Sequence, residues 1–81
     1  MPLYYKGMAQ FAGSRMEVLV NGESRTVRFD QTVAELLADL KLDPRHVAVE
    51  INLELAPRTA HAERKLQAGD RLEIVTFVGG G

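Results

Sequence analysis

The sequence predicts an α+β domain in which a mixed sheet of four or five strands packs on one main helix. Two observations favour this class. Several short segments repeat with the two-residue period of half-buried strands, and one segment has the wider spacing of an amphipathic helix. The chain has 81 residues, of which 46% are hydrophobic, so one small domain is expected.

The first two strands are expected to form a hairpin. Residues 16–20 alternate with period two, and Asn21-Gly22 follows, a dipeptide that tolerates the positive φ of tight hairpin turns. Residues 26–29 alternate again. The two segments therefore predict a β-hairpin, whose loop could extend through Glu23 and Ser24.

One helix is predicted to follow the hairpin. Thr32 is an N-cap candidate, and Glu35 three residues later completes a capping box. The apolar positions at helical spacing are Val33, Leu36, Leu37 and Leu40. This apolar face requires a sheet to cover, and Asp43-Pro44 ends the helix.

The second half of the chain contains the remaining strands. Residues 47–51 alternate with period two, residues 53–55 favour a short further strand, and residues 72–77 form the last alternating segment. The polar stretch 59–67 predicts a turn or a short helix. Two strands, a helix and two or three further strands give the order of the β-grasp fold, a mixed sheet wrapped around one helix.

The chain divides into three parts. Residues 1–15 show no sustained period and are interpreted as a flexible N-terminal extension. Residues 16–78 are the expected β-grasp domain, and residues 79–81 are interpreted as a flexible glycine tail. The alternative for the extension is an arm that binds a partner through Tyr4 and Tyr5.

Composition excludes several classes of function. With a net charge of −1, the chain has no excess of positive charge with which to bind nucleic acid or an anionic membrane. There is no cysteine, which excludes a disulfide, a Cys-ligated metal and a thiol nucleophile. No apolar run reaches the ~20 residues of a membrane span, and a signal peptide is not evident. We therefore expect a cytoplasmic protein that binds neither nucleic acid nor membrane.

No catalytic or metal-binding set is evident. His46 and His61 lack further ligands at metal-site spacing and are interpreted as surface or packing residues. No serine or threonine lies in a nucleophile elbow. We expect no catalytic residue, no metal and no bound cofactor, which leaves an enzyme in its own right without a credible catalytic set.

The glycine tail is the unusual feature of the sequence. Gly79, Gly80 and Gly81 directly follow the last alternating segment. Without side chains such a tail is thin and adopts any φ, and residues 78–81 could reach about 13–14 Å, enough to enter a narrow channel. The group delivered is the α-carboxylate of Gly81, an anion at neutral pH. It becomes an acyl electrophile only after adenylation by a partner, and a sulfur nucleophile that displaces AMP would leave a thiocarboxylate.

The last strand carries a second candidate feature. Leu72 and Ile74 should face the helix, which places Val75 and Phe77 on the opposite, solvent-facing side of the sheet. Together with Val78, these two side chains are predicted to bind a partner that receives the tail. The alternatives are cover by the N-terminal extension and a contact between copies of the chain.

Four parts of the sequence resemble the ThiS family, the ubiquitin-like sulfur carriers of thiamine biosynthesis. They are residues 16–22, residues 31–37, residues 47–52 with the Ala56-Pro57-Arg58 corner, and the ending formed by residues 69–75 and 77–81. The resemblance covers residues 16–81. The chain departs from the family pattern in its N-terminal extension and at Leu53, where the family often has glycine.

The resemblance implies a carrier cycle. A ThiF-type adenylating enzyme would use ATP and magnesium on Gly81, and a cysteine desulfurase or another persulfide donor would supply sulfur. The thiocarboxylate would then pass its sulfur to thiazole synthase (ThiG) for thiazole formation. The small subunit of molybdopterin synthase, a sulfur carrier with the same fold and a Gly-Gly end, is an alternative. A β-grasp interaction or regulatory module with an incidental glycine tail is an alternative from another class.

Overall fold

The structure is a computed structural model, and it describes residues 14–77. The predictions for residues 1–13, and for Val78 and the three glycines after it, lie outside the described residues. Within the described range there are five strands, one α-helix and two short 3-10 helices. No helix in this range is long and apolar enough to cross a membrane.

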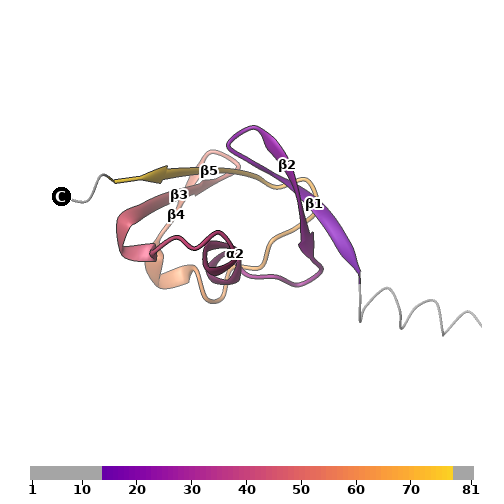
Figure 1. The fold of residues 1–81 in the computed structure, drawn as a ribbon, viewed down its shortest axis with the longest axis horizontal. Helices are drawn as coiled ribbons and strands as arrows, with labels where there is room; N and C mark the ends of the chain where they lie inside the picture. Colours follow the sequence, from indigo (N-terminus) through magenta and orange to yellow (C-terminus); the bar gives the residue numbers. More distant parts are fainter. Residues whose placement is uncertain (1–13, 78–81) are drawn as a thin grey trace, which may run out of the picture.

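The strands form one mixed sheet with the helix on one face. The elements are β1 (Arg15–Val20), β2 (Glu23–Arg28), α2 (Val33–Asp39), η1 (Pro44–His46), β3 (Val47–Ile51), β4 (Glu54–Ala56), η2 (Arg58–Ala60) and β5 (Arg71–Thr76). The strand order is β2-β1-β5-β3-β4, with β1 and β5 parallel and all other neighbours antiparallel. Figure 1 shows α2 lying against one side of this sheet. The predicted β-grasp arrangement is confirmed, and the short strand β4 is present.

The first hairpin turns through two residues only. Asn21 and Gly22 both have positive φ, 52° and 86°, as a two-residue turn that matches strand twist requires. Glu23 and Ser24 pair with Val20 and Leu19. The loop therefore does not extend into these two residues, because the Asn-Gly dipeptide alone reverses the chain.

Helix α2 begins at the predicted capping box. Oγ1 of Thr32 accepts from the Glu35 N–H at 3.1 Å, and Oε1 of Glu35 accepts from the Thr32 N–H at 2.9 Å. A helix of this length is marginal alone. Its stability comes from the burial of its apolar face, formed by Val33, Leu36 and Leu37.

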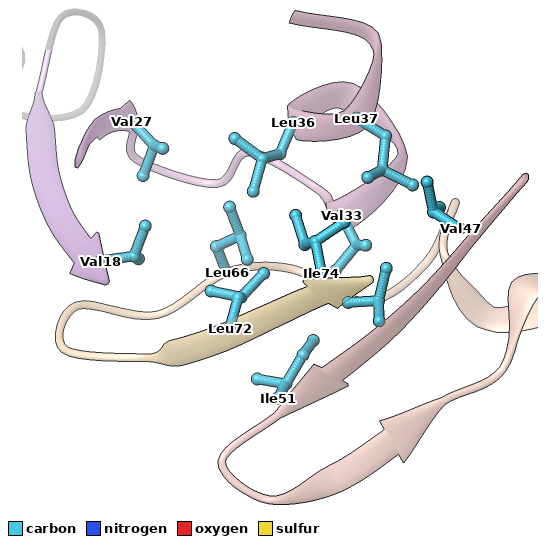
Figure 2. Close-up of a cluster of buried hydrophobic side chains, with 11 residues drawn as sticks. Val18, Val27, Val33, Leu36, Leu37, Val47, Ile51, Leu66, Leu72 and Ile74 are labelled. Atoms are coloured by element: carbon cyan, nitrogen blue, oxygen red, sulfur yellow. The ribbon is translucent and has the colours of Figure 1, made fainter. Parts of the chain in front are cut away.

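The core lies between α2 and the sheet. Figure 2 shows the side chains of the helix and of the strands pointing toward one another. The strands contribute Val18, Val27, Val47, Val49, Ile51, Leu72 and Ile74, and Leu66 enters from the loop before β5. Leu72 and Ile74 are 1% and 7% exposed, so they face the helix as predicted.

The β3–β4 turn is strained at one position. Asn52 and Leu53 have φ of 54° and 73°, and the side chain of Leu53 lies almost entirely in solvent. Asparagine tolerates the left-handed region, whereas leucine clashes with its own backbone there. The departure from glycine at Leu53 therefore leaves the turn intact but strained.

Replacing Leu53 by glycine should stabilise the domain. Removal of the left-handed penalty, about 1–2 kcal/mol, outweighs the added chain entropy of glycine, about 0.5–1 kcal/mol, so urea unfolding of Leu53→Gly should show a gain of roughly 0.5–1 kcal/mol. Gly22→Ala is the matched control, because Gly22 has φ of +86° and open space around its Cβ position, so it should lose stability through backbone strain alone. A Leu53→Gly variant less stable than wild type would contradict this account.

Candidate functional site

The candidate site is the end of β5 that leads toward the glycine tail. Val78, Gly79, Gly80 and Gly81 lie outside the described residues, so the structure describes the approach to them. The N–H of Phe77 donates to the carbonyl of His46 at 2.7 Å. This bond continues the β3–β5 ladder beyond Thr76 and fixes the main chain as far as Phe77.

A capped turn holds His46 in place. Oδ1 of Asp43 accepts from the Arg45 N–H at 2.9 Å and so caps η1. The Arg45 guanidinium donates to both oxygens of the same carboxylate, with its shortest bond at 2.7 Å. The hydrogen bonds from the guanidinium, and next the one from the Arg45 N–H, hold the pKa of the Asp43 carboxyl well below its usual range.

A side chain replaces a strand beside the second half of β5. The β1–β5 pairing is limited to Leu19 with Arg71 and Val20 with Leu72, because the hairpin turns away after Val20. Oδ1 of Asn21 accepts from the Ile74 N–H at 2.7 Å, and its Nδ2 donates to the Ile74 carbonyl at 3.1 Å. The Asn21 amide thus pairs with both main-chain groups of Ile74. Sequence reasoning assigned Asn21 only to the turn.

Apolar side chains gather on the open face of the sheet. Val75 and Phe77 are 58% and 51% exposed, on the side away from α2, as predicted. Leu55 of β4 is 68% exposed on the same face, since Leu55 and Glu73 both pair with Glu50. We call Val75, Phe77 and Leu55 the apolar patch. Leu55 was missed because only the strand register places it there.

An acidic pair borders the apolar patch. Glu50 on β3 lies directly opposite Glu73 on β5, and both are exposed. Like charges in directly opposite positions destabilise a sheet. By the same register Glu50 stands between Leu55 and Glu73, and the exposed Arg71 lies on this face two residues before Glu73. The open face therefore combines apolar side chains with charged ones of both signs.

The histidines belong to the framework. His61 is 4% exposed, and its Nε2 lies 2.9 Å from the carbonyl of Ala56, so it packs the loop after β4. His46 is exposed at its side chain and contributes its carbonyl to Phe77. Within residues 14–77, no group of three or more His, Cys, Asp or Glu side chains could hold a metal ion.

The fold and the position of β5 define a β-grasp domain whose last strand leads directly into the chain end with three glycines. A sequence model of the ThiS family matches residues 18–81. The chain belongs to the ThiS family, and the resemblance drawn from the sequence is confirmed.

Similar proteins support the fold and the family. The crystal structure of the thiamine biosynthesis protein (ThiS) from Geobacter metallireducens matches with a TM-score of 0.70 and 38% identity, over 82% of this chain and 100% of that one. The sulfur carrier protein ThiS of Escherichia coli is 32% identical over 66 residues, which are 82% of this chain and 100% of that protein.

Longer proteins contain a similar segment. A thiazole synthase of Paramagnetospirillum magneticum is 47% identical over 66 residues, 82% of this chain. A thiazole synthase of Magnetococcus marinus is 36% identical over a stretch of the same length. The matched segment spans 20% of each of these two enzymes.

The charge on Asp43 should stabilise the fold in a pH-dependent way. Asp43→Asn keeps an oxygen acceptor at the N-cap but removes the charge. Because the folded-state pKa of Asp43 lies below its unfolded value of about 3.9, the charge contributes stability above that value and loses it as pH falls through the folded pKa. The difference in thermal stability between wild type and Asp43→Asn should be present at about pH 5 and shrink below about pH 4.

The control for this measurement is Glu63→Gln. Glu63 is exposed, and its side chain makes no hydrogen bond or ion pair within residues 14–77. The difference in thermal stability between Glu63→Gln and wild type should change little over the same pH range. A stability difference between wild type and Asp43→Asn that grows as the pH falls from about 5 to 3 would contradict the assignment.

Proposed function

We propose that this chain is a sulfur carrier of thiamine biosynthesis and that the carboxyl group of Gly81 is the point of sulfur attachment. The observation that carries the proposal is the family match, which extends through Gly81, together with similarity over the whole length of the sulfur carrier protein ThiS of Escherichia coli. The chain then acts as a protein co-substrate in the cytoplasm, and its partners perform the chemistry.

The proposed cycle has balanced steps. A carboxylate oxygen of Gly81 attacks the α-phosphorus of ATP on a ThiF-type enzyme with magnesium, and pyrophosphate leaves. The terminal sulfur of a persulfide, formed by a cysteine desulfurase or another donor, attacks the acyl carbon, and AMP leaves. A thiol then reduces the new sulfur–sulfur bond, which leaves the thiocarboxylate on the carrier and a disulfide on the donor side.

The geometry of β5 supports this cycle. The ladder to β3, the Asn21 amide and the bond from Phe77 to His46 hold the main chain as far as Phe77. The apolar patch lies beside this end of the strand. A partner could therefore contact a fixed surface while the residues without side chains enter its channel.

The thiazole pathway is favoured over the molybdopterin alternative. Two enzymes named thiazole synthase contain a segment similar to this chain. A carrier domain joined to its receiving enzyme gains a high effective concentration at that enzyme. We infer that thiazole synthase (ThiG) receives the sulfur from this chain.

The direct test is the intact mass of the carrier. After incubation with a purified ThiF-type enzyme, ATP, magnesium, a persulfide donor and a thiol, the chain should gain the mass of one sulfur minus one oxygen. Deletion of Gly80 and Gly81 should abolish the gain. Failure of the full chain to gain this mass, in a reaction where the same enzyme converts its own cognate carrier, would refute the proposal.

The apolar patch should contribute to partner affinity. Phe77→Ser removes a half-exposed ring, so the unfolding free energy should fall by about 1 kcal/mol, which leaves the domain folded, while the Kd for the adenylating enzyme should rise on the order of tenfold or more. Binding is measured by calorimetry without ATP. Leu53→Ser is the matched control, because Leu53 is 89% exposed and lies in the β3–β4 turn, outside the patch. Equal affinities for Phe77→Ser and wild type would show that the patch does not bind the enzyme.

A further inference from the structure

The second half of β5 has one unpaired side. The N–H of Phe77 points to β3, where it donates to His46, whereas both main-chain groups of Ile74 point away from β3, to Asn21. Main-chain groups alternate between the two sides along a strand, so the N–H and C=O of Thr76 point the same way as those of Ile74. Within residues 14–77, β1 pairs no further along β5 than Leu72, and Thr76 has no partner on this side.

The cause is visible in the arrangement of the strands. In Figure 1 the β1–β2 hairpin lies near the first part of β5, and β5 then runs on toward the C-terminus. In this second part its paired neighbour among the described strands is β3. A central strand of the sheet thus becomes an edge strand over its last residues. Unpaired edges of this kind are sites where a further strand can add.

A groove of about 310 Å³ lies along the same side of β5. Apolar side chains of Val20, Leu40, Leu42 and Ile74 line it together with Thr76, and the polar residues Asn21, Glu23, Ser24 and Arg25 complete the lining. The groove and the apolar patch lie on opposite faces of the sheet, on either side of the unpaired edge. A strand added at Thr76 would direct alternate side chains into the groove and over the patch.

We propose that the free edge of β5 at Thr76 pairs with an extended segment of the ThiF-type adenylating enzyme, with an apolar side chain of that segment in the groove. This rests on the proposed carrier function. Residues 78–81 reach about 13–14 Å, so an enzyme that holds the Gly81 carboxylate must have its channel wall within that distance of Phe77. The unpaired Thr76 groups supply the donor and acceptor that an added strand requires.

Amide hydrogen exchange of the full chain tests this pairing, with the purified ThiF-type enzyme and no ATP as the probe. In the free chain the Thr76 amide should exchange much faster than that of Phe77, which is bonded to β3. Saturation with the enzyme should slow exchange at Thr76 at least tenfold. Unchanged exchange at Thr76 in the saturated complex would overturn the proposal.

Other occupants give different results. Protection of Thr76 in the dilute free chain would assign the edge to another segment of the same chain. Protection that grows with the concentration of the free chain would assign it to a second copy. Either result would overturn the pairing with the enzyme.

A pair of variants gives a kinetic test. Thr76→Pro removes the unpaired N–H. It costs no hydrogen bond within residues 14–77, because that N–H has no acceptor there, and proline is tolerated at strand edges. Thr76→Val has a side chain of similar size and keeps the N–H. We expect the KM of adenylation for Thr76→Pro to exceed that of Thr76→Val on the order of tenfold, with the loss in KM rather than kcat. Equal KM values for two folded variants would contradict the pairing.

The two proposals fail in different ways. If the wild-type chain never gains sulfur, the carrier function is wrong. If it gains sulfur while Thr76 stays unprotected in the complex, only the strand pairing is wrong. Exchange at Thr76 in the wild-type chain decides the matter even if Thr76→Pro fails to fold.

Discussion

The structure depends on the main-chain pairing of β5. This strand lies between β1 and β3 and sends Leu72 and Ile74 into the core, so the sheet cannot form without it. Its pairing partners change along its length. Within residues 14–77, β1 pairs with the first residues, the Asn21 amide bonds to Ile74, and beyond Ile74 only β3 pairs with the strand. The same strand therefore stabilises the domain and leads to the candidate site.

The two-residue period of β5 separates these roles by face. Leu72 and Ile74 pack against α2, whereas Val75 and Phe77 lie in solvent. Burial of the first pair provides the hydrophobic free energy that a small domain needs. Val75 and Phe77, each more than half exposed, leave apolar area on the open face of the sheet, which is a feature of surfaces that contact a partner.

Local sequence patterns predicted the helix, the strands and the first turn. The contacts between distant parts of the chain depend on the register of the strands, which no local pattern gives. The capping box at Thr32 and the Asn21-Gly22 turn are local, since each satisfies its own backbone within a few residues. The second role of Asn21, as the hydrogen-bond partner of Ile74, joins positions far apart in the sequence and left no local signal. Leu55 entered the apolar patch for the same reason. The Leu53 turn formed against local preference because pairing of β3 with β4 outweighs the strain of one residue.

The position of the candidate site at the end of a central strand determines how easily the main chain there can open. Opening the chain at Phe77 breaks the bond to His46 and little else in the described ladder, whereas opening at Ile74 breaks the Asn21 pair and exposes a buried side chain. Local opening should therefore cost little at Phe77 and approach the global unfolding free energy at Ile74. Thr76 lies at this boundary, between Ile74 with its Asn21 bonds and buried side chain and Phe77 with a single bond to His46.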